Sequence, residues 1–174
     1  MTPIIELRDV DAHNWRACAD LEVAPEQRDF VSPVARYLCL CHFGGVWHPP
    51  AVYAGDDVVG FAMWAVDPGD QSGWIGGLVI DQARQRKGFG RGTLEALTRC
   101  LLETGGCSSC ALSYSPGNAA ARDLYRALGF VETGEIEDDE LVARFSPPAA
   151  ERRVLHRPRF RVYFLPIAHV AQLD

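Results

Sequence analysis

A glycine-rich stretch near the middle of the chain, residues 85–93, constrains the fold more than any other segment. The apolar residues 73–80 before it have the composition of a buried strand. Residues 90–103 after it carry three leucines at the i, i+3 and i+7 positions of one helix face, and two glycines end that helix. This order of strand, turn and helix places unpaired N–H groups and the positive end of the helix dipole at the turn, where they can bind a phosphate.

The residue types in this turn exclude two common phosphate loops. There is no Gly-Lys-Ser/Thr sequence, which excludes an ATP-binding P-loop. The glycines lack the spacing of a Rossmann dinucleotide site, and no acidic residue ends a strand about 20 residues later. A pyrophosphate cradle remains, with Arg86, Lys87 and Arg91 as added cations. The alternative is an ordinary glycine-rich turn with a solvated basic rim.

Strands and helices alternate along most of the chain. Apolar or alternating segments predict strands at residues 4–8, 51–54, 58–66, 73–80, 110–115, 131–133 and 140–145. Helical spacing and capping residues predict helices at residues 13–21, 33–40, 90–103 and 118–128. Strands mixed with helices in this order indicate an α/β (α+β) sheet domain.

Charge separates the chain into two regions. Residues 1–146 carry 12 Lys and Arg against 21 Asp and Glu, and we expect them to form one domain. Residues 147–174 begin with a Pro-Pro-Ala-Ala linker and carry five Arg against two acidic residues, so we expect a separate basic tail. The tail could be an added edge strand or a dimer contact. An acidic main body argues against a nucleic-acid partner and is compatible with a cationic substrate.

Composition argues against a membrane protein and against a metal site. No window approaches the roughly 18 consecutive apolar residues of a transmembrane helix. The first residues lack the basic and apolar regions of a secretory signal, so the expected location is cytoplasmic. The six cysteines are expected to be reduced, buried thiols. Cys107 and Cys110 have C-x-x-C spacing, but no second pair follows at zinc-finger spacing and the histidines are scattered, so no metal is expected.

A second motif follows the glycine-rich turn. Residues 118–130 read Asn-Ala-Ala-Ala-Arg-Asp-Leu-Tyr-Arg-Ala-Leu-Gly-Phe. This segment resembles the N-x-x-A-x-x-[LF]-Y-x-x-x-G-F signature of the GNAT family of N-acetyltransferases. Gln85, Gly88 and Gly90 resemble the pyrophosphate loop of the same family, [QR]-x-x-G-x-[GA]. The resemblance covers roughly residues 4–145.

The resemblance implies a mostly antiparallel central sheet flanked by helices, with acetyl-CoA as the co-substrate. The residues expected to bind acetyl-CoA are Leu78, Val79, Ile80, Gln85, Arg86, Lys87, Gly88, Phe89, Gly90, Arg91, Gly92, Thr93, Asn118 and Tyr125. Tyr125 lies about two helical turns after Asn118 on the same helix face, so its phenol could protonate the departing thiolate. A plain helix cap at Asn118 and a core role for Tyr125 are the alternatives.

A narrower resemblance points to the bacterial spermine/spermidine (diamine) acetyltransferase branch. It rests on residues 25–31, 52–61, 79–81, 112–114 and 134–135. Three side chains of such enzymes are missing here. The branch usually has Asn near Val34 and Arg near Gly77, and polyamine acetyltransferases of another branch have Glu near Gly76.

The acceptor amine must lose a proton before it attacks. With an amine pKa near 10.4, only about one molecule in a thousand is neutral at pH 7. Because Gly76 supplies no carboxylate, the candidate bases are Glu26, Asp81 and Glu140, or a chain of waters. Glu26 is our catalytic candidate beside Tyr125, because its segment covers the acceptor site in this fold.

The sequence thus predicts an N-acetyltransferase that acts by direct attack in a ternary complex on a small primary amine, with a polyamine as the favoured acceptor. Glu22, Glu26, Asp29 and Glu135 could pair with a polycation, and Trp47 and His48 could line the acceptor site. The alternatives are the same chemistry on an antibiotic, an amino acid or a protein N-terminus, and a non-catalytic acyl-CoA-binding module. Members of the family are often dimers, which allows a homodimer.

Overall fold

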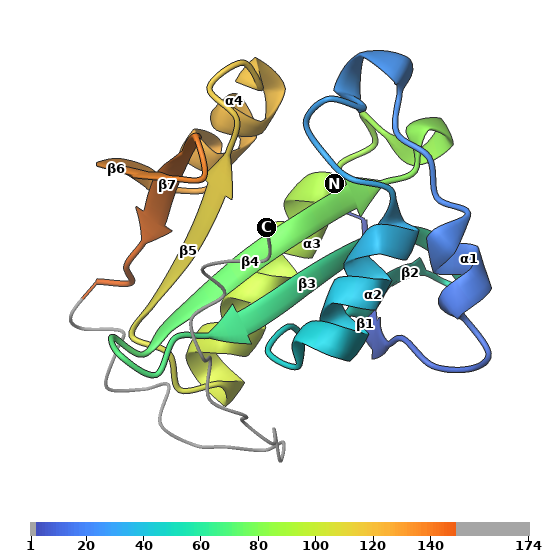
Figure 1. Cartoon of the computed structure of the whole chain (residues 1–174), viewed down its shortest axis with the longest axis horizontal. Helices are drawn as coiled ribbons and strands as arrows, with labels where there is room; N and C mark the ends of the chain where they lie inside the picture. The colour runs from blue at the N-terminus through green and yellow to red at the C-terminus, as the bar shows by residue number, and fades with distance from the viewer. Residues whose placement is uncertain (1–2, 149–174) are drawn as a thin grey trace.

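The structure is a computed structural model that describes residues 3–148, and it confirms the mixed α/β class. One seven-stranded sheet has the order β1-β2-β3-β4-β5-β7-β6 (Figure 1). Neighbouring strands are antiparallel except β4 and β5, which are parallel. The strands are β1 (Glu6–Asp9), β2 (Pro50–Ala54), β3 (Asp57–Val66), β4 (Ser72–Ile80), β5 (Ser109–Tyr114), β6 (Val131–Glu137) and β7 (Glu140–Phe145).

Helical segments connect these strands. The α-helices are α1 (Trp15–Ala19), α2 (Val34–Gly44), α3 (Phe89–Arg99) and α4 (Ala119–Ala127). Short 3-10 turns lie at η1 (Pro25–Gln27) and η2 (Gln82–Arg84), and a π-helical turn, η3 (Cys100–Thr104), continues α3.

Each face of the sheet has its own core. In Figure 1, α2 lies in front of the sheet and α3 passes behind β3 and β4. The front core joins Val34 of α2 to Phe61 of β3, whereas the rear core joins Leu97 of α3 to Ala62 and Leu112. Phe61 and Ala62 are consecutive, so the alternation of side chains along β3 sends them to opposite faces. The apolar runs of the central strands follow from burial on both sides.

The parallel pair β4 and β5 separates halfway along its length. Pairing between them ends at Ile75 and Leu112, although β4 continues to Ile80. A bulge in β4 also interrupts its register with β3, so neither β3 nor β5 pairs with Gly77 or Leu78. Gly77 has a φ of 56°, which a residue with a Cβ rarely adopts. The bulge therefore leaves backbone groups of β4 available at the opening between the two strands.

The predicted elements all form, but several differ in extent: the helix predicted at 13–21 spans only Trp15–Ala19, and the helix predicted at 33–40 continues to Gly44. Two further differences have a clear physical reason. The helix predicted at 90–103 is α-helical only to Arg99, because the N–H of Gly105 bonds to the carbonyl of Cys100 (3.0 Å) and closes a wider turn. A Cβ on Gly105 would lie 2.7 Å from the Leu101 carbonyl oxygen, so this turn needs glycine there. The strand predicted at 131–133 continues to Glu137. All residues of β6 are exposed, so the sequence shows no alternation of apolar and polar residues that would reveal its full length. The pairing of β6 with β7 defines the strand instead.

Other expectations concern thiols, membranes and metals. All six cysteines are free, but Cys39 and Cys100 are exposed, so the prediction of buried thiols is correct only for the other four. Within residues 3–148, no helix has the length and apolar character needed to cross a bilayer. The same residues contain no group of three or more His, Cys, Asp or Glu side chains that could hold a metal ion. Residues 149–174 of the predicted basic tail lie outside the described residues.

Candidate active site

A cleft of about 1100 Å³ occupies the opening between β4 and β5. The glycine-rich turn extends from the β4 side, whereas α4 and the β6–β7 turn lie beside β5 (Figure 1). Ten of the predicted site residues line this cleft: Glu26, Leu78, Ile80, Gln85, Arg86, Gly88, Gly90, Arg91, Asn118 and Tyr125. The two motifs that are far apart in the sequence therefore meet at one cavity.

The glycine-rich turn has the backbone geometry of an anion site. Arg86 (φ 59°) and Gly88 (φ 86°) are both left-handed, and Gly88 caps α3. The N–H of Gly92 bonds to the Gly88 carbonyl (3.0 Å), so the N–H groups of residues 89–91 have no acceptor within the helix. Arg86 and Arg91 both line the cleft, and the Arg91 guanidinium lies 3.6 Å from Glu95 Oε1. This arrangement fits a pyrophosphate.

Five predicted cofactor residues do not line the cleft: Val79, Lys87, Phe89, Gly92 and Thr93. Val79 is buried in the α2-side core. The ammonium group of Lys87 donates to the Ala83 carbonyl (2.8 Å), and the buried hydroxyl of Thr93 donates to the Phe89 carbonyl (2.8 Å). The side chains of Lys87 and Thr93 therefore stabilise the turn.

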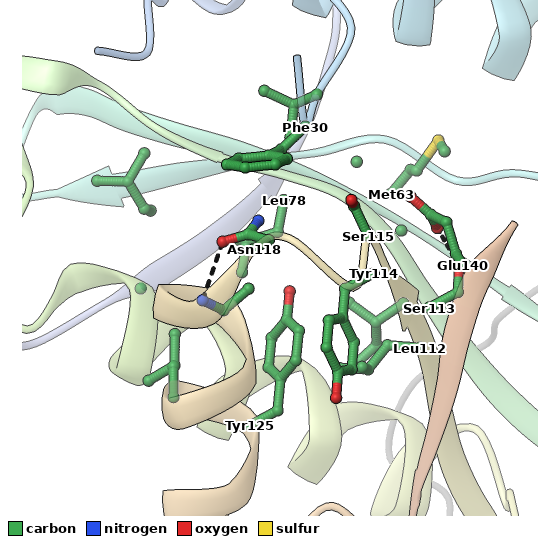
Figure 2. Close-up of a pocket in the computed structure, with 18 of the residues that line it drawn as sticks. Phe30, Met63, Leu78, Leu112, Ser113, Tyr114, Ser115, Asn118, Tyr125 and Glu140 are labelled. Carbon is green, nitrogen blue, oxygen red and sulfur yellow. Dashed lines mark hydrogen bonds between the residues drawn. The ribbon is translucent and has the colours of Figure 1, made fainter. Parts of the chain in front are cut away.

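Asn118 and Tyr125 approach the opening from α4. The phenol hydroxyl of Tyr125 points toward Leu78 on the bulged part of β4 and toward Asn118 (Figure 2). Asn118 accepts a hydrogen bond at Oδ1 from the N–H of Ala121 (3.1 Å), so it caps α4 and also borders the cleft. The Tyr125 ring packs edge-on against Tyr114, with 5.3 Å between ring centroids, which fixes its direction.

The surroundings of Tyr125 keep its phenol protonated. Burial, and then the negative charge of Glu140, raise the pKa of Tyr125 well above its ordinary value. The neighbouring Tyr114 differs, because its hydroxyl donates to Glu132 (2.6 Å) and points away from the cleft (Figure 2). Tyr125 therefore presents a proton to the cleft at neutral pH, as a general acid requires.

Carboxylates and aromatic rings border the cleft on the side of the β6–β7 hairpin. Glu137, Asp138 and Glu140 line it, as do Trp47 and Trp74. Burial, together with the charges of Asp138 and Glu140, raises the pKa of Glu137. These groups favour a cationic ligand, because carboxylates and the faces of indole rings both attract an alkylammonium ion.

This acidic lining differs from the one expected. Of the four predicted substrate carboxylates, Glu26 lines the cleft, whereas Glu22, Asp29 and Glu135 are exposed and lie outside it. Trp47 lines the cleft, but His48 stacks on Trp64 with 4.3 Å between ring centroids. Glu137 and Asp138 are not among the predicted site residues, whereas Glu140 is predicted only as one of the candidate bases.

The structure gives a physical reason for the two glycines where related enzymes have side chains. A Cβ on Gly76 would lie 3.2 Å from Met63 Cε and 3.3 Å from Trp47 Cη2. A Cβ on Gly77 would lie 3.3 Å from the Tyr37 ring. Aromatic rings and a thioether thus fill the space, and a carboxylate at position 76 would require Trp47 or Met63 to move.

The three candidate bases have different surroundings. The Asp81 carboxylate already accepts hydrogen bonds from the N–H groups of Ala83 (2.9 Å) and Glu22 (3.4 Å). Asp81 also does not line the cleft. Glu26 lies beside Gln27, whose side chain bonds to Gln85 (2.8 Å) at the glycine-rich turn. Glu140 lies on the β5 side of the opening.

The comparisons with known proteins agree with this geometry. Residues 7–130 match the acetyltransferase (GNAT) family. The chain is 31% identical over 144 residues to the spermine/spermidine N(1)-acetyltransferase of Bacillus subtilis (strain 168), a match that spans 76% of this chain and 91% of that protein.

Two solved structures share the fold. The spermidine N-acetyltransferase from Vibrio cholerae, solved with CoA and spermine, has a TM-score of 0.65 at 16% identity and covers 80% of this chain and 92% of its own. An aminoglycoside acetyltransferase solved with coenzyme A has a TM-score of 0.69 at 18% identity, with coverages of 86% and 98%.

The chain belongs to the acetyltransferase (GNAT) family. It is an N-acetyltransferase, and its co-substrate is acetyl-CoA.

Proposed function

We propose that the chain transfers the acetyl group of acetyl-CoA to a primary amine of a polyamine such as spermidine or spermine. The observation that carries this substrate class is that Glu137, Asp138 and Glu140 line the same cleft as the rings of Trp47 and Trp74. A flexible polycation can satisfy several carboxylates at once, and its methylene segments can pack on the rings. The polyamine acetyltransferase relative from Bacillus subtilis supports the same class.

The residues on the β4 side of the cleft suit the co-substrate. The backbone of the glycine-rich turn at Gly88, Gly90 and Arg91 binds the pyrophosphate, with the side chains of Arg86 and Arg91 as counter-charges. Leu78, Ile80 and Asn118 border the path of the pantetheine arm. Acetyl-CoA supplies the activated carbonyl. Backbone N–H groups of the β4 bulge polarise that carbonyl, and Tyr125 donates its phenol proton to the sulfur that departs.

The amine attacks directly, without an acetylated enzyme. Among residues 3–148, no cysteine lines the cleft. Burial raises the pKa of Cys110 to about 12 and that of Cys18 to about 11, so neither is a ready nucleophile. Intact mass spectrometry after incubation with acetyl-CoA alone should show no acetylated protein. A stoichiometric acetyl adduct that transfers to an added amine would contradict direct attack.

The substrate class is tested by incubating the purified chain with acetyl-CoA and a pool of amines. The pool contains spermidine, spermine, diamines, kanamycin and amino acids, and mass spectrometry identifies the acetylated products. We expect the mass gain of one acetyl group on the polyamines first. If kanamycin alone is acetylated, the chain is still an acetyltransferase of a primary amine, but its acceptor is an aminoglycoside and not a polyamine. Binding of CoA with no acetylated amine in the pool would favour a non-catalytic acyl-CoA-binding module.

A further inference from the structure

We infer that Glu140, held by Ser113, is the base that takes the proton from the acceptor ammonium. Glu140 is the first residue of β7, is half-buried and lines the cleft. The inference rests on the proposed function, because it assigns a residue to that reaction.

The contact with Ser113 fixes the direction of the carboxylate. The Ser113 hydroxyl donates to Glu140 Oε2 across 2.6 Å, from the neighbouring strand β5 (Figure 2). Within residues 3–148, no hydrogen bond ends at the other oxygen, Oε1. A carboxylate held at one oxygen and open at the other can accept a proton from a ligand in the cleft.

Glu140 and Tyr125 can act on the same pair of reactants. Tyr125 comes from α4 and packs in the α3-side core, whereas Glu140 bonds to Ser113, whose neighbours Leu112 and Tyr114 belong to that core. Since side chains alternate along β5, Ser113 and its partner face the α2 side. Both side chains nevertheless line the same cleft, and the charge of Glu140 contributes to the raised pKa of Tyr125. An amine that enters from the α2 side meets Glu140 before it reaches the carbonyl near Tyr125.

The other carboxylates of the cleft are less suited to this role. Glu26 lies next to Gln27, which is tied to the glycine-rich turn, and therefore on the side of the pyrophosphate. Glu137 and Asp138 belong to the hairpin turn, where they can hold the remaining ammonium groups of a polyamine. Asp67 also lines the cleft, but its carboxylate accepts from the N–H of Gly69 (2.7 Å) in the β3–β4 turn, whereas the Glu140 carboxylate accepts from Ser113 of β5.

The protons of the reaction balance with these two groups. The ammonium gives one proton to Glu140, which releases it to solvent, and the neutral amine forms the C–N bond as the C–S bond breaks. Tyr125 gives its phenol proton to the sulfur. The second proton leaves the nitrogen as the amide forms and returns to Tyr125 through water. The products are the acetamide, the free thiol and one proton in solution.

The test is the pH dependence of spermidine acetylation by Glu140→Gln in the full chain. We expect kcat to fall about a hundredfold at pH 7, and kcat/KM to recover roughly tenfold per pH unit toward pH 9, because the free amine then forms in solution. Other ionisable side chains, Glu137, Asp138 and Tyr125, lie in the same part of the structure, so the complete pH profiles of variant and wild type are compared. Ser113→Ala should lower kcat at pH 7 about tenfold, because it removes one hydrogen bond to the charged Glu140 carboxylate.

Two variants serve as comparisons. Glu135→Gln lies on the same hairpin outside the cleft and should keep the wild-type profile. Glu26→Gln tests the competing base: if Glu26→Gln shows the pH rescue and Glu140→Gln does not, the assignment is wrong. A Glu140→Gln variant with raised KM and unchanged kcat would likewise overturn it, because Glu140 would then only bind the cation.

The two proposals fail in different ways. Wild-type activity with spermidine tests the proposed function, whereas the ratio of variant to wild type tests the base. If kanamycin is acetylated and spermidine is not, the proposed substrate class is wrong. The ratio of Glu140→Gln to wild-type activity is then measured with kanamycin to test the base. If the wild type acetylates neither amine, the proposed function fails and the base assignment fails with it. Melting temperature and acetyl-CoA affinity, both expected to be unchanged in Glu140→Gln, show that the fold is intact.

Discussion

Tyr125 shows how one side chain acquires its chemistry from its neighbours. Its ring packs between Tyr114 and Phe130, with centroid separations of 5.3 Å and 6.2 Å. A phenol is protonated at physiological pH at its ordinary pKa, and burial and the charge of Glu140 raise the pKa of Tyr125 further. The ring makes the packing contacts, whereas the proposed proton transfer needs the hydroxyl, so a mutation that removes only the hydroxyl separates the two roles.

Tyr125→Phe should lower kcat about a hundredfold while it leaves the melting temperature and the affinity for CoA unchanged. The matched control is Tyr114→Phe, because the Tyr114 hydroxyl bonds to Glu132 outside the cleft. Steady-state kinetics and calorimetry with both variants check this. Equal losses of kcat in the two variants would point to a packing effect and not to an acid at Tyr125.

The glycine-rich turn works as a unit with β4 and α3. Gln85 secures the turn by donating from Nε2 to the Ile80 carbonyl (2.9 Å) at the end of β4. Gly88 then reverses the chain with a φ of 86°, and α3 begins. We propose that the turn binds the pyrophosphate through backbone N–H groups, so a negative side chain in it should exclude this anion.

Gly88→Glu should abolish CoA binding in calorimetry while circular dichroism remains that of a folded protein. The strained φ alone costs about 1–2 kcal/mol of stability. Gly106→Glu is the control, since Gly106 also has a positive φ (66°) and a Cβ there would meet no atom within 4 Å. Unchanged CoA affinity in Gly88→Glu would refute the pyrophosphate assignment.

The β6–β7 hairpin supplies the acidic part of the cleft. A double variant, Glu137→Gln with Asp138→Asn, should raise KM for spermidine about tenfold with little change in kcat, because these groups attract the cation away from the reacting nitrogen. Wild-type KM should also rise as pH falls through the raised pKa of Glu137, since the carboxyl then loses its charge. Kinetics at several pH values and salt concentrations measure both effects. An unchanged KM for spermidine would show that the β6–β7 hairpin does not bind the substrate.

Residues 3–148, the part of the chain that the structure describes, contain a seven-stranded sheet with a core on each face. We therefore predict that truncation after Ser146 leaves the melting temperature and turnover unchanged. Light scattering of the full and truncated chains shows at the same time whether the chain forms a homodimer. A fall of several degrees in melting temperature, or a loss of dimer and activity together, would show that residues 147–174 belong to the folded unit.

Much of this site was predictable from the sequence because it depends on local backbone signals. The glycines at 88 and 90 and the capping Asn118 act within a few residues of their own position, so their roles follow from spacing. The contributions of Glu137 and Asp138 depend on which strands become neighbours. Nothing local indicates that β7 inserts between β5 and β6, and this topology brings the acidic turn to the cleft. The filling of the space at Gly76 by Trp47 is a tertiary contact of the same kind.

The most direct test of the account is a crystal structure of the full chain with CoA and spermidine. We predict the pyrophosphate on the N–H groups at the start of α3, the sulfur beside the Tyr125 hydroxyl, and a terminal nitrogen of spermidine within about 3 Å of a Glu140 oxygen. CoA bound elsewhere than between β4 and β5, or spermidine bound outside the cleft bordered by Glu137 and Glu140, would contradict it.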